Sequence, residues 1–332
     1  MKRRRLLPMI AAAAALSLTF SGCSGSGGDT SSSGSTGTQY TIGVAVIVSH
    51  PALQAVQDGF TEVLDEQGLN YKLKSQNAQG DNANAATIAS AFASDPSLDL
   101  ILAISTPIAL AMANAEKDRP ILFSAVTDPV AVGLVPSWTQ AGPNITGTSD
   151  LNPDAKPVTL VQQAMPDVKT IGVLYSSSEP NSLAQVTAYQ AEAASIGVTL
   201  VPQAITQAAE VSVGLESLAG VDAILIPTDN TVAASIASVI GYGQEHQIPV
   251  FCADTSTVSL GTVAARGLSY HDLGRRTGEM AVSILRDGVD VSTIPPEATT
   301  STELIVNPTA AEKYGLTLPA DLVSQAAQVE GS

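Results

Sequence analysis

The chain has 332 residues, of which 45% are hydrophobic, 4% aromatic and 14% charged, and its formal net charge is −16. This acidity argues against nucleic acid as a partner and against a polybasic contact with a membrane surface. The chain is longer than a single hydrophobic core usually supports, so we expect two domains after the N-terminal segment.

The N-terminal segment predicts export from the cytoplasm. Four basic residues at positions 2–5 precede an apolar run over residues 6–20, which is too short for a comfortable membrane span. This pattern is typical of a secretory signal peptide, and we place it at residues 1–22. Removing it takes away four positive charges and lowers the net charge to about −20.

The end of the apolar run indicates a lipid anchor. The sequence Phe20-Ser21-Gly22-Cys23 resembles the lipobox of bacterial lipoproteins, in which the cysteine is lipidated after cleavage, although Phe20 departs from the usual leucine, valine or isoleucine. An ordinary signal peptide with an incidental Cys23 is the alternative. Residues 24–39 consist almost wholly of Gly, Ser, Thr and Asp, so we expect residues 23–39 to form a flexible tether.

The folded part repeats itself with an offset of 129 residues. Residues 41–44 and 170–173 have the same sequence, Thr-Ile-Gly-Val, and residues 120–125 correspond to residues 249–254 at the same offset. Residues 99–105 also parallel residues 222–228. Such internal similarity indicates two structural units of the same kind.

Each half alternates strands and helices. In the first half, apolar runs and helical spacing predict strands over residues 41–48, 71–75, 100–104 and 121–125, and helices over residues 53–67, 84–94 and 106–117. Gly68 is expected to cap the first helix at its C-terminus. Short apolar strands between helices favour a parallel sheet covered on both faces. The fold class predicted is therefore α/β, with two doubly wound parallel-sheet lobes.

The last third adds a strand, a helix and a tail. Residues 262–268 have the pattern of a strand, residues 272–286 that of an amphipathic helix, and residues 304–306 that of a short extended segment.

Ligands of open parallel sheets bind beyond the carboxyl ends of the strands, and polar residues gather there in this sequence. Ser105 and Thr106, followed by Pro107, fit the N-terminus of a helix that holds a carboxylate, or simple helix capping. Thr127 and Asp128 follow another strand. Asp128 is a candidate partner for an ammonium group, or it opens a turn with Pro129.

The second half offers a corresponding set. Glu179 and Asn181 flank Pro180 in a loop that also starts a helix, and Asp229 is either a helix cap or an ammonium ligand. Asp254 follows a buried strand directly. His50 lies at the exit of the first strand, in a cleft or in a loop. The complete set of candidate ligand-binding residues is His50, Ser105, Thr106, Thr127, Asp128, Ser149, Glu179, Asn181, Asp229, Asn230 and Asp254.

Signs of an enzyme or of a metal site are scarce. The sequence has no Gly-x-Ser-x-Gly elbow, no Gly-x-Gly-x-x-Gly fingerprint and no Walker-type phosphate loop. His50, His246 and His271 lack metal-ligand spacing, so we expect neither a metal nor a cofactor. With Cys23 lipidated, Cys252 has no partner for a disulfide, and we interpret it as a core residue.

Several ordered segments resemble the substrate-binding lipoproteins of bacterial ABC transporters, in the branch with tryptophan- and tyrosine-binding members. They are residues 50–53, 105–107, 123–129, 144–150, 172–175 with 179–182, 227–230 and 270–274. The resemblance implies a type I periplasmic-binding-protein fold with three crossovers. It implies a first lobe of residues 40–149 plus about 266–288 and a second of residues 150–265 plus about 289–328, joined by a multi-strand hinge.

The same resemblance implies the function of a monomeric, extracytoplasmic protein anchored to the bacterial membrane. Such a protein captures a small solute, here an amino acid and possibly an aromatic one, and passes it to a permease with its ATPase. Three alternatives stay open. They are a sensory receptor of the same fold, a lipid-anchored enzyme, and a sugar or nucleoside binder, which the shortage of aromatic residues disfavours.

Overall fold

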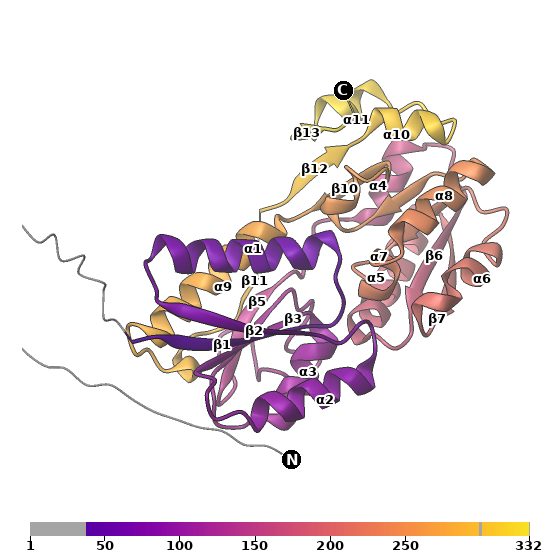
Figure 1. Cartoon of the computed structure of the whole chain (residues 1–332). Coiled ribbons are helices and arrows are strands. Elements are labelled where there is room, and N and C mark those ends of the chain that lie inside the picture. Colours follow the sequence, from indigo (N-terminus) through magenta and orange to yellow (C-terminus); the bar gives the residue numbers. More distant parts are fainter. Residues whose placement is uncertain (1–37, 299–300, 332) are drawn as a thin grey trace, which may run out of the picture. The chain divides into compact units, whose positions relative to one another are not determined.

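The computed structural model describes residues 38–298 and 301–331 (Figure 1). The expected signal peptide, the lipidated Cys23 and nearly all of the tether lie outside the described residues. The elements from Tyr40 onward belong to one compact unit that begins at Thr38.

The first lobe is built on a parallel sheet of six strands with helices on both faces. The strand order is β11-β5-β4-β3-β1-β2. In Figure 1, α1 and α9 cover one face of this sheet, and α2 and α3 cover the other. The elements are β1 (Tyr40–Val46), α1 (Pro51–Glu66), β2 (Tyr71–Asn77), α2 (Asn82–Ala93), β3 (Leu100–Ile104), α3 (Thr106–Ala115), β4 (Ile121–Ser124), β5 (Ile145–Ser149), α9 (Tyr270–Leu285) and β11 (Glu297–Ala298).

Two glycines allow α1 and α9 to pack closely. A Cβ atom at Gly59 would lie 2.1 Å from the carbonyl oxygen of His271, and one at Gly274 would lie 2.0 Å from that of Val56. No side chain fits at these distances, so the contact between the two backbones requires glycine at both positions. This pairing fixes the start of each helix at the same edge of the sheet, where His50 and Tyr270 lie.

The second lobe repeats the plan with four parallel strands in the order β7-β6-β8-β9. Its core is a separate cluster of buried apolar side chains, to which Cys252 contributes, as the sequence predicted. The elements are α4 (Pro157–Ala164), β6 (Thr170–Ser176), α5 (Pro180–Ile196), β7 (Thr199–Ile205), η1 (Ala208–Glu210), α6 (Val211–Glu216), β8 (Ala223–Ile226), α7 (Asn230–Ala233), α8 (Ile236–His246), β9 (Val250–Cys252) and η2 (Thr255–Thr257).

The internal repeat is visible in matching hydrogen bonds. In the first lobe the carboxylate of Asp99 accepts a 2.7 Å bond from the backbone N–H of Thr41. In the second lobe the carboxylate of Asp222 accepts a 2.8 Å bond from the N–H of Thr170, which is 129 residues after Thr41. Each aspartate therefore ties the start of the first strand of its lobe to the start of the strand beside it. The repeated sequence encodes a repeated structural bond.

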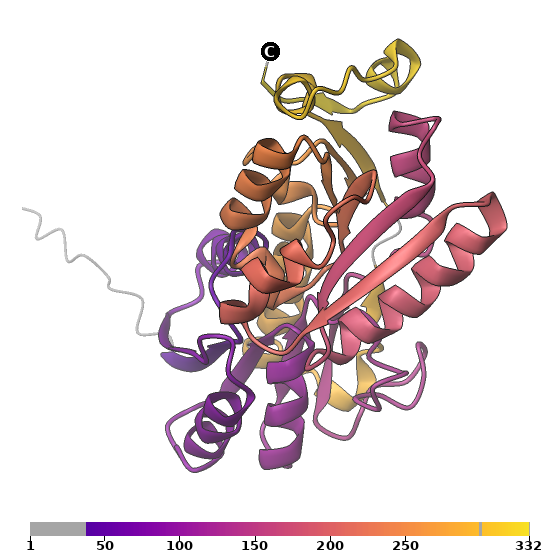
Figure 2. The same ribbon diagram turned by 90° about the vertical axis from the view of Figure 1, so that its right-hand side faces the viewer.

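The C-terminal part forms a third, small sheet with the strand order β10-β12-β13. Residues of β10, of β12 and of the helices after β12 pack into the core of the second lobe, and Figure 2 shows the part after residue 300, in yellow, beside that lobe. The elements are β10 (Ala264–Gly267), η3 (Val291–Thr293), β12 (Glu303–Val306), α10 (Pro308–Lys313), α11 (Ala320–Ser324) and β13 (Gln328–Val329).

The chain passes between the two cores three times, after β5, after β10 and after β11. Val291 and Ile294 still pack on the first core, and β11 pairs in parallel with β5. The first sheet therefore continues past residue 288, where the sequence placed the last crossover.

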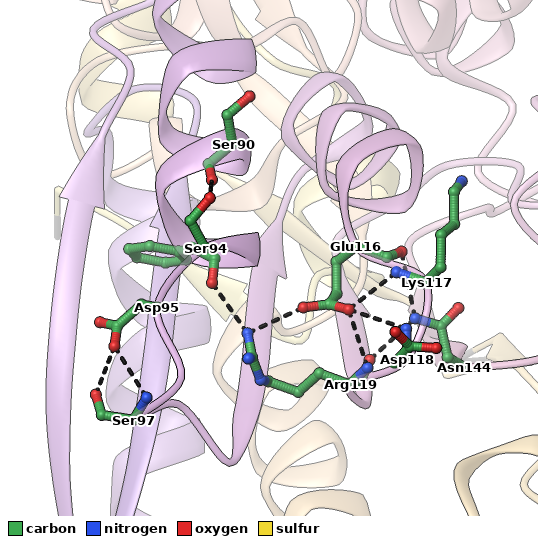
Figure 3. Close-up of polar contacts among 10 residues, drawn as sticks. Ser90, Ser94, Asp95, Ser97, Glu116, Lys117, Asp118, Arg119 and Asn144 are labelled. Carbon is green, nitrogen blue, oxygen red and sulfur yellow. Dashed lines mark hydrogen bonds and ion pairs between the residues drawn. The ribbon is translucent and has the colours of Figure 1, made fainter.

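The ends of α2 and α3 opposite the carboxyl edge of the first sheet are joined by a polar cluster (Figure 3). The Glu116 carboxylate accepts bonds from the backbone N–H groups of residues 117–119 and a 2.9 Å bond from the Arg119 guanidinium. Arg119 also donates to the carbonyl oxygen of Phe92, at the end of α2. The Glu116 carboxylate and the Arg119 guanidinium thus both bind protein groups, so we interpret the cluster as structural.

Candidate functional site

A narrow pocket lies where the carboxyl ends of the strands of both lobes converge. The first lobe contributes His50, Leu53, Ala125 and Thr127, and the second contributes loops after β6, β8 and β9. Asp150 directly follows β5, and Tyr270 is the first residue of α9. The remaining lining residues are Asn181, Pro227, Thr228, Asp229, Asn230, Ala233 and Asp254.

His50 links the two lobes across this pocket. It is the N-cap residue of α1 with an extended backbone (φ −153°), but its side chain makes no capping bond. Instead, its Nε2 atom lies 3.2 Å from Oδ1 of Asn230 in the second lobe. Its Nδ1 atom is buried and has no partner among the described residues. The imidazole therefore has one nitrogen directed at the opposite lobe and one available to a bound molecule.

Two further polar atoms of the pocket lack partners in the described part of the chain, Oδ1 of Asp150 and Oδ1 of Asn181. Both side chains are more than nine-tenths buried, with exposed fractions of 8% for Asp150 and 4% for Asn181. Buried polar groups in proteins are almost always hydrogen-bonded, because an unsatisfied one costs about 1–3 kcal/mol. Three such atoms lining one pocket indicate a site for a polar ligand.

Of these three atoms, Oδ1 of Asp150 is the most costly to leave without a hydrogen bond, because it belongs to a carboxylate. Its Oδ2 atom accepts a 3.0 Å bond from the hydroxyl of Tyr270, and its Oδ1 atom has no hydrogen-bond partner within bonding distance in the described residues. Burial raises the pKa of Asp150, the nearby hydroxyls of Thr127 and Tyr270 act in the opposite direction, and the charge of Asp254 adds to the rise. A cationic group beside Oδ1 would offset both the cost of burying the charged carboxylate and the repulsion between Asp150 and Asp254.

Asp254 brings a second acid to the same pocket. It is 3% exposed, and its two oxygens accept bonds from the backbone N–H and the hydroxyl of Ser256. Burial raises its pKa, and the charge of His50 opposes that rise. Among the residues that line the pocket, His50 is the sole basic side chain against the acids Asp150, Asp229 and Asp254. The pocket is thus suited to a ligand with a positive charge.

A larger cavity of about 720 Å³ adjoins the pocket and shares Thr127, Asp150, Thr228 and Tyr270 with it. Its volume falls within the range of known small-molecule sites, roughly 300–1,000 Å³. Tyr189 and Leu268 give it an apolar wall, together with Leu151, Pro153, Ala155, Pro157, Ala188 and Ala191. The narrow pocket therefore offers polar groups, and the adjoining cavity offers space.

Two of the acids predicted to bind a ligand are used within the second lobe. The Glu179 carboxylate accepts four bonds from the backbone N–H groups and the side chains of Asn230 and Thr231, and a longer one of 3.4 Å from the side-chain amide of Asn181. The Asp229 carboxylate accepts bonds from the Ser176 and Val232 N–H groups and from the Ser182 hydroxyl. Burial, with the charge of Glu179 beside it, raises the pKa of Asp229. These bonds organise the loops before α5 and α7.

Four other candidates from the first lobe, and Glu179 as well, line neither cavity. The Asp128 carboxylate accepts a bond from the Ala131 N–H, so it serves the turn at Pro129. The Ser149 hydroxyl donates to the carbonyl oxygen of Thr127, and the Thr106 hydroxyl accepts from the Thr127 N–H. Ser105 is buried with its Oγ atom unpaired in the described chain and has a positive φ of 96°. The candidates that do line the pocket are His50, Thr127, Asn181, Asp229, Asn230 and Asp254.

Asp150 and Tyr270 are not among the site residues predicted from the sequence. Asp150 follows β5, a strand with the sequence Ile-Thr-Gly-Thr-Ser that lacks an apolar run typical of a buried strand. Tyr270 is the first residue of α9, two residues before the predicted start of that helix at residue 272. The signal for Asp150 was its place one residue after a strand end, the same place that drew attention to the other acids.

In residues 38–298 and 301–331, no group of three or more His, Cys, Asp or Glu side chains is arranged to hold a metal ion. Of the helices in that part of the chain, none is both long and apolar enough to cross a membrane.

Residues 41–330 match the family described as ABC transporter substrate binding protein. The chain is 38% identical over 315 residues to a tyrosine-binding protein of Clostridioides difficile, covering 92% of this chain and 91% of that protein.

Solved structures show the same similarity. A domain from Streptococcus pneumoniae in complex with L-Trp is 34% identical, with a TM-score of 0.83 over 88% of this chain and all of that one. A substrate-binding protein with adhesive properties from Clostridium difficile, in its ligand-free, open form, is 42% identical but has a TM-score of 0.63 over the same shares. The described chain is therefore closer in structure to the ligand-bound relative, although its sequence is closer to the open one.

Proposed function

Because this chain belongs to the family of ABC transporter substrate-binding proteins, we propose that it captures an amino acid between its lobes and delivers it to a membrane permease with its ATPase. Binding proteins of this family carry out no chemical reaction on the solute, and their role in ABC import is extracytoplasmic. The acidic pocket with three unpartnered polar atoms supports the amino acid as the ligand.

The observation that carries the proposal is the unpaired Oδ1 atom of buried Asp150, with Asp254 nearby. An α-ammonium group placed there would neutralise a buried carboxylate and donate the missing hydrogen bond. The unpaired Oδ1 atom of Asn181 is a second acceptor for the same group.

The α-carboxylate of the ligand would meet the N-terminus of α1. His50 and Leu53 bring the start of this helix of 16 residues to the pocket, and the His50 side chain does not occupy the helix N–H groups as a cap. A helix N-terminus favours an anion through these N–H groups and the helix dipole. Contacts from both lobes to one ligand would stabilise the arrangement in which the lobes meet.

The side chain of the ligand would extend into the adjoining cavity, along Tyr189, Leu268 and Tyr270. This wall suits an aromatic side chain. The names of two relatives refer to tyrosine and to L-Trp, and they support an aromatic amino acid here.

A calorimetric screen tests the proposal. The purified protein is titrated with L-tyrosine, L-tryptophan, L-leucine, D-glucose and a nucleoside after any co-purified ligand has been removed by partial unfolding and refolding. We expect binding of one or both aromatic amino acids and a rise in melting temperature with ligand concentration. Binding of the sugar or nucleoside alone would contradict the proposed ligand class and leave the family assignment standing.

We further propose that residues 1–22 direct export, that Cys23 carries the lipid and that the mature protein works as a monomer on the outer face of the membrane. Metabolic labelling with a fatty acid, compared between the natural protein and the Cys23→Ser variant, tests the anchor. We expect label in the first and none in the second. The lobes are proposed to divide as predicted, except that the packing of Val291 and β11 favours a first lobe reaching Ala298.

A further inference from the structure

The larger cavity is lined by two basic residues that the amino-acid proposal does not use, the partly exposed Arg266 and the exposed Lys156, in a chain whose net charge is −16. We refer to these two residues together as the basic side of the cavity. Each of the other arginines in the described ranges pairs with a carboxylate, namely Arg119, Arg275, Arg276 and Arg286. Arg266 has no carboxylate partner in the described residues, so its guanidinium is available to an anion from outside the chain.

The partners of these two side chains are weak or missing. Arg266 donates one 3.4 Å bond to the side-chain oxygen of Gln163, and the ammonium group of Lys156 has no hydrogen bond or ion pair in the described part of the chain. The Nδ2 donor of Asn152, in the same cavity wall, is buried and also without a partner there. Three donor-bearing side chains thus face one cavity with little to bind.

The cavity is also lined by the acidic residues Glu192 and Asp150, which differ in their hydrogen bonds. The Oε1 atom of Glu192 accepts bonds of 2.8 and 2.7 Å from the N–H and the hydroxyl of Thr159. Asp150 lies at the junction with the narrow pocket, where it is more than nine-tenths buried with Oδ1 unpaired. The joined cavities therefore have an acidic end at Asp150 and Asp254 and a basic side at Arg266 and Lys156.

We propose that this basic side is a subsite for the C-terminal carboxylate of a dipeptide whose N-terminal ammonium binds Asp150 and Asp254. The inference rests on the proposed function, because it uses the same ammonium site. Arginine is suited to the role, since its planar guanidinium can hold a carboxylate through two parallel bonds. The cavity of about 720 Å³ has room for a second residue beside an aromatic side chain.

The test is a cycle that changes the carboxylate and its partner separately. The purified full chain and its Arg266→Gln variant are titrated by calorimetry with tyrosyl-alanine and with tyrosyl-alanine amide, which lacks the terminal charge. We expect Arg266→Gln to weaken binding of tyrosyl-alanine by about tenfold or more and to have little effect on the amide, because the lost interaction needs both partners. Arg286→Gln, which removes an exposed arginine paired with Asp287, is the matched control.

L-tyrosine and L-tryptophan are titrated alongside to separate the two proposals. Binding of either amino acid without tyrosyl-alanine would overturn the dipeptide subsite and leave the proposed function intact. So would an equal loss for tyrosyl-alanine and its amide in Arg266→Gln. Failure of every ligand to bind the natural protein would overturn both proposals.

Discussion

The two lobes place a titratable residue at the same point of the repeat and use it differently. His50 and Glu179 are 129 residues apart, and each is the N-cap residue of the long helix after the first strand of its lobe. Glu179 is saturated by four bonds to Asn230 and Thr231, whereas His50 keeps one buried nitrogen unpaired. The repeat therefore specifies where a polar residue lies, and tertiary contacts determine whether it is free to bind.

A second pair of N-cap residues shows the same contrast. Ser105, at the start of α3, has no side-chain bond in the described chain, while Asp229, at the start of α7, accepts three. The acids of the second lobe largely build their own loops, and Asp254 is the one that also faces His50. Most of the binding capacity is then expected from His50, Asp150 and Asp254.

The largest effect is expected from Asp150→Asn. The variant removes the carboxylate proposed to hold the ligand ammonium but keeps an oxygen to accept the Tyr270 bond, so affinity should fall by about 100-fold, as expected when one partner of a buried charge pair is lost. Calorimetry measures this loss. A fall of less than about threefold would place the ammonium elsewhere.

The same variant should be more stable without ligand. Burial raises the pKa of Asp150 above its ordinary value, so the folded state binds the proton more tightly than the unfolded state does. The resulting stability is present below that ordinary value and is lost as the pH rises through the raised pKa. At neutral pH, Asp150→Asn should therefore gain about 1–3 kcal/mol in the free energy of unfolding and lose part of this pH dependence. Urea unfolding at pH 5 and pH 7.5 measures both effects.

Glu179→Gln tests the N-cap residue of the second lobe, whose carboxylate is fully hydrogen-bonded within the protein. Its amide group would meet donors where the carboxylate now accepts four bonds, so we expect a loss of about 2–3 kcal/mol in the free energy of unfolding. The affinity of the protein that remains folded should change little. A stable variant with greatly weakened binding would instead make Glu179 a direct ligand residue.

His50→Asn tests the equivalent N-cap residue of the first lobe, whose buried Nδ1 atom has no partner in the described residues. Asparagine retains the preference for a helix N-cap but cannot reach both Asn230 and the ligand, so affinity should fall by about tenfold with a small change in stability. The comparison with Glu179→Gln is the control. Equal losses of stability in the two variants would remove the distinction between the lobes.

Asp128→Ala should have the smallest effect on binding. The carboxylate of Asp128 serves the turn through the Ala131 N–H and lines neither cavity, so affinity should stay within about twofold and stability should fall by about 0.5–1 kcal/mol. A large loss of affinity would restore Asp128 to the site, as the sequence alone suggested.

The sequence predicted most of the fold because its signal is local. The strand at residues 100–104 was predicted with the bounds of β3, and the repeat at Thr41 and Thr170 marked the first strand of each lobe. The strand β5 was not predicted, because its buried threonines are polar and are satisfied by hydrogen bonds to residues far away in the sequence. Thr146 donates to the carbonyl oxygen of Ile294, and Thr148 bonds to Thr277. No apolar run marks such a strand.

The sequence directed attention to the strand ends, and the structure places two of the residues named there, His50 and Asp254, in the lining of the pocket. Their role in binding stays a prediction. Whether an acid such as Glu179 is satisfied depends on donors more than 50 residues away, at Asn230 and Thr231, and this cannot be derived from spacing. Asp150 stands out only once burial and the absence of a partner in the described residues are known.

Recognition of a ligand ammonium group by the acidic pocket is tested most directly with analogues of the ligand. The affinity of the protein for L-tyrosine is compared by calorimetry with that for 3-(4-hydroxyphenyl)propionate, which has the same ring and carboxylate but no ammonium. We expect the deaminated analogue to bind at least about 100-fold more weakly, because Asp150 and Asp254 would then lie near each other without a cation. Equal affinity for the two compounds would contradict it.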